Sequence, residues 1–318
     1  MKVLVTGGAG FIGFHTSQAL LARGDNVIIV DSLNEYYDPS LKRARLKILE
    51  QNANCTFIHA DVSDEEVMEK VFKKHSFDKV CHLAAQAGVR YSLDHPLVYE
   101  NANGKGTLVL LEMCKKHSVN HFVYASSSSV YGGSKELPFK ENNPVMEPIS
   151  LYAATKRYNE LQAHVYHKLY GIQCTGLRFF TVYGPYGRPD MALFLFTKAI
   201  LEGKPIDVYN NGDMKRDFTY ITDIVSGVIA SLDNPYPYEI INLARGEQIK
   251  LMDFISEIET YLGKKAQKNM MPLQMGDVPE TSGDIEKAQK LLGYKPQTSV
   301  KEGVQNFIKW YKEYYNTE

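Results

Sequence analysis

The chain has 318 residues, of which 44% are apolar and 23% charged, a balance that is ordinary for a compact soluble protein. Its 36 Lys and Arg nearly equal its 37 Asp and Glu, so no excess of positive charge favours nucleic acid or an anionic membrane surface as a partner. No signal-peptide pattern opens the chain and no apolar run reaches the roughly 18 residues of a membrane span, so we expect a cytoplasmic protein.

Short apolar runs rich in β-branched residues alternate with longer segments of helical period. Runs that are apolar on both faces are typical of a parallel sheet covered by helices, which predicts a doubly wound α/β (Rossmann) fold. The predicted strands span residues 2–6, 26–31, 55–61, 79–85 and 121–127. Four cysteines lack C-x-x-C spacing and nine histidines lack a ligand spacing, so we expect reduced thiols and no metal.

The pattern changes after a predicted helix at 152–170 and a strand at 173–180. A loop rich in Gly and Pro, TVYGPYGRPDM, follows, and beyond it helices at 191–203, 222–233, 251–262 and 299–315 are separated by irregular stretches. We therefore predict a larger domain over 1–178, which also receives 217–248, and a smaller α/β domain over 179–318 that covers the substrate.

The stretch TGGAGFIG follows the first predicted strand directly and opens a helix. Gly7 permits the tight turn, Gly10 lets the backbone approach a pyrophosphate, and Gly13 lets the helix pack on the sheet. Free N–H groups near Phe11 and Ile12 would face the anion. Together with the flanking strand and helix, this spacing predicts a dinucleotide site; the alternative is a glycine-rich turn that serves packing alone.

An acidic residue, Asp31, ends the second predicted strand. Its carboxylate would accept hydrogen bonds from the adenosine 2′- and 3′-hydroxyls and repel a 2′-phosphate, which favours NAD over NADP. Lys42 and Arg43 lie further along and complicate that preference. At the end of the third strand, Asp61 and Val62 are candidates for contact with adenine, although an Asp in that place is as often a simple turn or cap residue.

Tyr152 and Lys156 stand four residues apart in YAATK, on one face of the predicted helix. A free tyrosine loses its proton only near pH ~10, but a neighbouring ammonium and a positively charged nicotinamide both favour the phenolate. Tyr152 is therefore a candidate general base. Most such pairs are solvated helix faces; the preceding glycine fingerprint and the serine-containing strand end favour the catalytic interpretation.

In chain order, TGGAGFIG, Asp31, HLAAQAGVR, SSSSVYG, Y-x-x-x-K and RFFTVYGP resemble the extended short-chain dehydrogenase/reductase family, in particular its nucleotide-sugar epimerases and dehydratases. The resemblance implies an N-terminal NAD domain, a smaller domain for a sugar nucleotide, and NAD that stays bound through turnover. It adds Ala84 of HLAAQAGVR to the expected cofactor contacts. It also implies a homodimer packed through helices around 97–117 and 152–170.

The same resemblance assigns roles at the reacting carbon. Tyr152 would take the proton from the sugar C4 hydroxyl as hydride passes to NAD. Lys156 would hold the nicotinamide ribose and lower the pKa of the tyrosine. Ser127 occupies the family's catalytic Ser/Thr position and would hydrogen-bond the C4 oxygen. The ketone would then turn over in the site and receive the hydride on its opposite face.

The run SSSSVYG, residues 126–132, is either a flexible linker or part of the active site. Related dehydratases carry Asp-Glu here and UDP-glucuronate decarboxylases a Glu, because those reactions need an additional proton-transfer group. Serine hydroxyls are not useful acids near neutral pH, but they can bind a sugar carboxylate. We therefore expect Ser126, Ser128 and Thr181 to hold a uronate carboxylate away from the geometry in which the 4-ketone loses carbon dioxide.

Segments GRPDMALFLFTKAI and KRDFTY resemble the UDP-glucuronate 4-epimerases closely, whereas Thr181 stands where many other members carry Asn. The family's pyrophosphate-contacting Arg corresponds to Arg216, with Arg188 and Arg90 as further candidates for the UDP-sugar and Asp277 for the uridine ribose. The leading prediction is NAD-dependent 4-epimerisation of UDP-glucuronate to UDP-galacturonate. The alternatives are UDP-glucuronate decarboxylation, 4-epimerisation of UDP-glucose or UDP-N-acetylglucosamine, and a non-catalytic NAD-binding protein.

Overall fold

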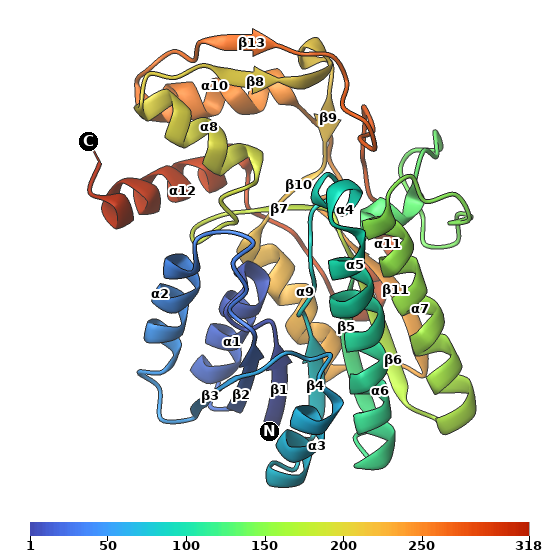
Figure 1. The fold of residues 1–318 in the computed structure, drawn as a ribbon. Coiled ribbons are helices and arrows are strands. Elements are labelled where there is room, and N and C mark those ends of the chain that lie inside the picture. Colours follow the sequence, from blue (N-terminus) through green and yellow to red (C-terminus); the bar gives the residue numbers. More distant parts are fainter. Residues whose placement is uncertain (318) are drawn as a thin grey trace.

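A computed structural model describes residues 1–317 and places a seven-stranded parallel sheet at the centre of the molecule (Figure 1). The strand order is β11-β6-β5-β4-β1-β2-β3, and every neighbouring pair is parallel. The strands are β1 (Lys2–Thr6), β2 (Asn26–Asp31), β3 (Cys55–His59), β4 (Lys79–His82), β5 (His121–Ser127), β6 (Gln173–Phe179) and β11 (Tyr238–Leu243). The predicted doubly wound fold is confirmed.

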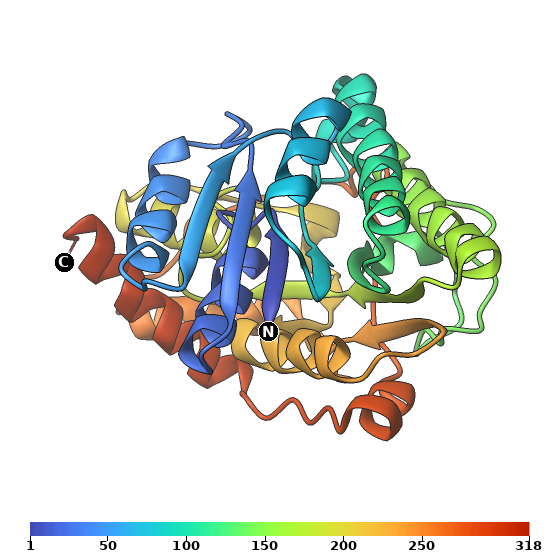
Figure 2. The ribbon, with the colours of Figure 1, turned by 90° about the horizontal axis from the view of Figure 1, so that it is seen from below.

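Helices cover both faces of this sheet, as the view from below shows (Figure 2). The order of strands runs outward from β1 in both directions, and right-handed crossovers then place successive helices on opposite faces. One face carries α1 (Phe11–Ala22), α2 (Pro39–Leu49), α9 (Ile221–Asp233) and α11 (Glu286–Leu292), and the other carries α3 (Glu65–Lys74), α6 (Gly106–Lys116) and α7 (Leu151–Tyr170). Each face encloses its own apolar core.

Helix α7 begins and ends at residues suited to those positions. The Ser150 hydroxyl accepts a hydrogen bond from the Ala153 N–H at 3.1 Å and satisfies one of the free donors of the first turn. Gly171 ends the helix in the left-handed conformation, with φ of +72°. These caps fix where the helix starts, and the Tyr-x-x-x-Lys pair therefore lies in its first two turns, next to the carboxyl ends of the strands.

The helix predicted around 97–117 is present as one helical run over residues 96–116, but it is not regular. It consists of α5 (Pro96–Tyr99), a π-helical stretch at Glu100–Lys105 and α6, and the short α4 (Tyr91–Asp94) precedes it. Side chains of α7 bond to carbonyl groups of this stretch: the Asn159 amide donates to Asn103 O at 2.9 Å and the Gln162 amide to Gly104 O at 3.1 Å. Such tertiary bonds compensate for the weaker π geometry and tie it to α7.

The C-terminal lobe lies above the carboxyl ends of the strands (Figure 1). It is built from α8 (Ala192–Leu201), α10 (Leu251–Leu262), α12 (Val300–Tyr315) and three two-stranded sheets, around a separate aromatic-rich core. The paired strands are β7 (Thr181–Tyr183) with β10 (Phe218–Tyr220), β9 (Lys215–Arg216) with β12 (Ile249–Lys250), and β8 (Ile206–Val208) with β13 (Lys268–Met270). Between these segments the chain returns to the large sheet through α9 and β11.

None of the helices in residues 1–317 combines the length and apolar content that crossing a membrane requires. The four cysteines are free thiols, three of them buried and Cys55 partly exposed.

Candidate active site

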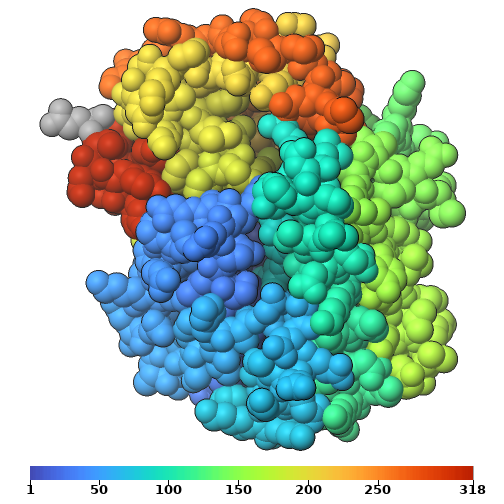
Figure 3. Space-filling view, viewed as in Figure 1, coloured from blue at the N-terminus to red at the C-terminus, as the bar shows by residue number. Residues whose placement is uncertain are grey.

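A cavity of about 350 Å³ lies at the carboxyl ends of the strands, where β1 and β4 start crossovers to opposite faces. Ligands of doubly wound folds bind at this switch point. Its walls come from residues 31–42, 83–102 and 179–191, which belong to the region where the blue, teal and yellow surfaces converge in Figure 3. All the predicted cofactor contacts line it: Gly7, Gly10, Phe11, Ile12, Gly13, Asp31, Asp61, Val62, Ala84 and Lys156.

The glycine turn leaves no room for larger side chains. Gly7 has φ of +70°, and a Cβ there would lie 2.6 Å from the Ala84 nitrogen. A Cβ on Gly13 would lie 2.1 Å from the Gly7 carbonyl oxygen, because the start of α1 packs directly on the turn. This close packing brings the N-terminal end of α1 to the cavity wall, which is the geometry that a pyrophosphate requires.

Asp31 is anchored by backbone donors and faces the cavity. Its carboxylate accepts the Ala9 N–H at 3.1 Å and the Leu33 N–H at 2.8 Å, one on each oxygen. Since each carboxylate oxygen has two lone pairs, acceptor capacity remains for ribose hydroxyls. The Lys42 ammonium also lines the cavity and donates to Asn34 through both the carbonyl and the side-chain oxygen, each at 2.7 Å.

Asp61 combines the two interpretations that the sequence left open. It lines the cavity, and one of its oxygens accepts bonds from the Ser63 N–H and the Ser63 hydroxyl, both at 2.8 Å. The residue therefore shapes the turn after β3 while it remains at the cavity surface beside Val62.

Tyr152, Lys156 and Ser127 converge on the cavity from α7 and from the end of β5. Lys156 is 3% exposed, and its ammonium donates to the Ala125 carbonyl oxygen at 2.8 Å. Burial lowers the pKa of Lys156 to about 7. Burial raises the pKa of the Tyr152 phenol, whereas the Ser127 side chain and the Arg188 charge act to lower it. Within this chain, then, Ser127 and Arg188 supply the stabilisation of the phenolate.

The serine run is not a linker. Ser126 and Ser127 are the last residues of β5, and Ser128–Tyr131 form a 3-10 turn in which Ser127 caps the Ser129 N–H. The Ser127 oxygen accepts the Ser129 N–H at 3.1 Å and its hydroxyl donates to Ser129 Oγ at 3.1 Å. The flexible-linker alternative is therefore wrong.

The structure argues against the role predicted for Ser126. Its hydroxyl donates to Glu160 Oε1 at 2.7 Å in a buried cluster, so it is not available as the carboxylate donor that the sequence predicted. Neighbouring residues of a strand send their side chains in opposite directions, and adjacent serines are not equivalent for this reason. Ser128 is partly exposed at the start of the 3-10 turn. Thr181 begins β7, beside Phe180 and Val182, which line the cavity.

The residues predicted to contact the UDP part of the substrate fall into two groups. Arg188 lines the cavity and forms a bidentate pair with Asp190, with nitrogen to oxygen distances of 3.0 and 2.5 Å, and Asp190 also accepts the Tyr36 hydroxyl at 2.9 Å. Arg216 and Arg90 meet at Asp277, at 2.8 and 3.7 Å. All three residues of the second group were predicted from the sequence, and the structure brings them together.

Several residues of the site gave no signal in the sequence. Tyr36 and Asp190 come from loops 154 positions apart, so no spacing could pair them. Asn103, within the π-helical stretch, holds the cavity wall by accepting the Gln86 N–H at 2.8 Å and donating to the Gln86 carbonyl at 3.0 Å. Lys42 appeared only as a possible complication for cofactor choice. Within residues 1–317, no group of three or more His, Cys, Asp or Glu side chains is arranged to hold a metal ion.

Comparison with known proteins gives concordant matches. The family described as GDP-mannose 4,6 dehydratase matches residues 4–307. The chain is 53% identical to an uncharacterized protein of Methanocaldococcus jannaschii, with 98% of this chain and 96% of that protein covered. It is 48% identical to UDP-glucuronate 4-epimerase 4 of Arabidopsis thaliana, over 99% of this chain and 76% of that one. Among solved structures, the UDP-glucuronic acid 4-epimerase of Bacillus cereus in complex with UDP-glucuronic acid and NAD superposes with a TM-score of 0.93 at 38% identity, covering 99% and 100% of the two chains.

Proposed function

We propose that this chain, which belongs to the GDP-mannose 4,6-dehydratase family, is an NAD-dependent UDP-glucuronate 4-epimerase. The relatives named UDP-glucuronate 4-epimerase are 41–48% identical over 99% of the chain. The single observation that carries the proposal is the convergence of Tyr152, Lys156 and Ser127 on a cavity whose other end is the glycine turn and Asp31. This arrangement supports the proposal, because candidate proton-transfer groups and a candidate dinucleotide site line one cavity.

The residues present fit NAD. The turn at Gly7 and Gly13 excludes any Cβ and brings the α1 N-terminus to the cavity, and Asp31 retains lone pairs for the ribose hydroxyls. When bound, NAD supplies a reversible hydride acceptor. The chain's own residues would bind and orient the dinucleotide, and Lys156, which is buried and lines the cavity, would hold its nicotinamide ribose.

At the reacting carbon, Tyr152 accepts the proton of the C4 hydroxyl and later returns it. The phenol is held near Ser127, whose hydroxyl lies at the cavity surface and would exchange its bond to Ser129 Oγ for one to the C4 oxygen. General acid–base transfer of this kind contributes about 100-fold to 10,000-fold in rate. Epimerisation then requires only that the 4-ketone presents its other face before hydride returns.

The serine run favours epimerisation over decarboxylation. Residues 126–129 carry hydroxyls alone, so this stretch offers no carboxylic acid to protonate the product of decarboxylation. With the Ser126 hydroxyl bound to Glu160, Ser128 and Thr181 remain the candidates for holding the sugar carboxylate. We assign the diphosphate to Arg216 and the uridine ribose to Asp277, with Arg188 and Arg90 as further cations for the UDP-sugar.

Product identification tests the proposal. Purified protein is incubated with UDP-glucuronate, and in parallel with UDP-glucose and UDP-N-acetylglucosamine. UDP-galacturonate as the main product supports the proposal. A UDP-pentose would identify a decarboxylase, preferential turnover of the neutral sugars would identify another epimerase, and no turnover of any of the three would favour a non-catalytic NAD-binding protein.

We also propose a homodimer that packs through α6 and α7. On α7 the side chains of Tyr158, Leu161, Val165 and Leu169 are 43–67% exposed at helical spacing. Leu108 on the neighbouring α6 is 38% exposed and extends the same apolar face. A second copy of this face is a self-complementary partner. Replacing Leu161 and Val165 together by Glu should give monomers in sedimentation velocity, whereas Leu195→Glu on α8, equally exposed, should not.

Finally, we place the protein in the cytoplasm, where thiols stay reduced. The four free cysteines support this location. Fractionation of cells that produce the tagged chain tests it.

A further inference from the structure

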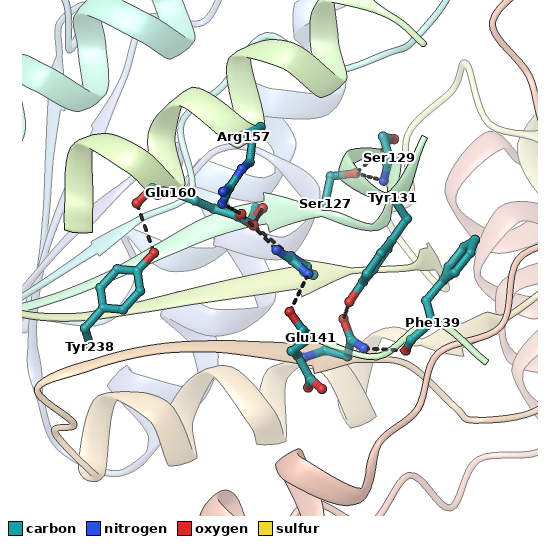
Figure 4. Close-up of polar contacts among 11 residues, drawn as sticks. Ser127, Ser129, Tyr131, Phe139, Glu141, Arg157, Glu160 and Tyr238 are labelled. Carbon is teal, nitrogen blue, oxygen red and sulfur yellow. Dashed lines mark hydrogen bonds and ion pairs between the residues drawn. The ribbon is translucent and has the colours of Figure 1, made fainter. Parts of the chain in front are cut away.

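A buried polar cluster centred on Glu160 lies beside the serine run and contacts its first residue, Ser126 (Figure 4). The Glu160 side chain is fully buried, and its two oxygens accept from Arg178 Nε at 2.8 Å and Nη2 at 2.9 Å. They also accept from the Ser126 hydroxyl at 2.7 Å and from Arg157 Nη1 at 2.9 Å. Burial alone would raise the pKa of Glu160, but the Arg178 guanidinium lowers it below its ordinary value, so the carboxylate is charged.

The cluster joins the elements that carry the catalytic side chains. Glu160 lies one turn after Lys156 and two turns after Tyr152, on the same face of α7. Ser126 precedes Ser127 on β5, and the register partner of Ser126 on β6 is Arg178. One carboxylate thus fixes the end of β5 and its neighbour β6 to the helix that carries the proton acceptor.

Arg178 also supports the chain on the other side of Ser127. Its guanidinium carbon lies 4.7 Å from the centre of the Tyr131 ring, and Tyr131 closes the 3-10 turn that Ser127 caps. The Tyr131 hydroxyl in turn donates to Asn242 Oδ1 at 2.7 Å on β11. Ser127 is therefore flanked by two anchors, the Ser126 hydroxyl before it and the Tyr131 ring after it, and both depend on the Glu160–Arg178 pair.

A buried ion pair is weak evidence for stability, because the desolvation of two charges offsets most of their attraction. The pair does fix the orientation of its side chains, because a bidentate guanidinium–carboxylate contact holds both partners in one geometry. From this arrangement we propose that Glu160 and Arg178 are positioning residues, which hold Ser127 at a set distance from Tyr152 through Ser126 and Tyr131. The proposal deepens the proposed function and rests on it for the identity of the substrate.

The test compares Ser126→Ala and Glu160→Gln with the parent enzyme, each with its bound NAD. Because misplacement of a catalytic group by about 1 Å can cost about 100-fold, we expect kcat for UDP-glucuronate to fall by about 10-fold to 100-fold. KM and NAD content should change by less than about threefold, since the hydroxyl and the carboxylate that are changed bond to each other in the buried cluster. Ser126→Thr, which keeps the hydroxyl, should restore most of kcat.

The matched control is Glu259→Gln. Glu259 is a buried carboxylate in α10 of the C-terminal lobe that pairs with Lys265 and Lys268. The Glu259→Gln variant should lose thermal stability and keep kcat. If Ser126→Ala and Glu160→Gln lower activity only in proportion to lost folded protein, as the control does, the positioning role is overturned.

A measurement without substrate separates this inference from the proposed function. The pKa of Tyr152 is obtained from the ultraviolet phenolate titration of NAD-bound protein, as the difference from a Tyr152→Phe variant. Since the Ser127 side chain lowers this pKa, both cluster variants should raise it and the control should leave it unchanged. A shift confined to the cluster variants supports the inference even if UDP-glucuronate is not turned over, and an unchanged Tyr152 pKa refutes it.

Discussion

Lys156 is an ionisable side chain that is almost completely buried. Replacing it by Met shows what the burial of its charge costs in free energy of unfolding. Met has similar length and no charge. In the folded protein the pKa of Lys156 is lowered from 10.5 to about 7 by burial. In the unfolded chain the ammonium keeps its proton up to the ordinary pKa of about 10.4. Between these two pH values the unfolded state binds more protons than the folded state, so the free energy of unfolding must rise with pH.

The magnitude follows from the two pKa values. One unit corresponds to about 1.4 kcal/mol, and from about pH 6 to about pH 9 roughly two units of the interval are crossed. Relative to Lys156→Met, the parent protein should therefore gain about 3 kcal/mol in its free energy of unfolding over this range. The bond from Lys156 to the Ala125 carbonyl and any change in packing add an offset to this difference, while the slope reports the titration.

The assay is urea unfolding of both proteins at several pH values, after removal of NAD, because a bound dinucleotide would itself contact Lys156. All other titrating groups are common to the two proteins and cancel in the difference. The parent should be the less stable of the two at low pH and should approach the variant as pH rises. Parallel pH profiles, with a difference that stays constant within about 1 kcal/mol, would refute the inference that Lys156 is held in a strongly desolvating environment.

Three further predictions concern the site. Tyr152→Phe should lower kcat for C4 epimerisation by about 100-fold to 10,000-fold with bound NAD retained, and turnover within about tenfold of the parent would reject Tyr152 as the proton acceptor. Asp31→Ala should reduce the NAD content of the purified protein and its discrimination against NADP in equilibrium binding; an unchanged preference would assign selectivity to other residues such as Lys42. Arg216→Ala should raise KM for UDP-glucuronate by at least about tenfold, the effect of a lost charge-assisted hydrogen bond, and a loss confined to kcat would contradict a role in binding UDP.

Strongly periodic segments could be predicted almost to the residue. The strands at 2–6, 26–31 and 121–127 and the helix at 251–262 have the predicted bounds, because long apolar runs and clear helical spacing leave little choice. The predicted strands at 55–61 and 79–85 end early, at His59 and His82, since the following residues bend away to line the cavity. Strands of two or three residues in the C-terminal lobe carry no usable period and were missed, as was α11.

Within the site, the residues marked by a motif were easier to find than those placed by tertiary contact. The glycine turn, Asp31 and the Tyr-x-x-x-Lys pair have fixed spacings, and all of them line one cavity. The direction of the Ser126 side chain depends on Glu160, and four identical letters in a row give no hint of it. The π-helical stretch is equally hidden, because it depends on tertiary bonds: amide groups of α7 donate to its carbonyls, and its Asn103 bonds to Gln86.

That π-helical stretch has a consequence for how the chain tolerates change in length. A π turn is in effect an α-helix with one surplus residue, and deleting one residue from 100–105 would let the helix close into regular α geometry. The repaired helix would be sound in isolation, yet Asn103 would rotate away from Gln86 and the wall beside the cavity would lose its backbone clamp. The irregularity thus acts as a spacer between a helix and a pocket, and shortening the chain there should harm the pocket while improving the helix.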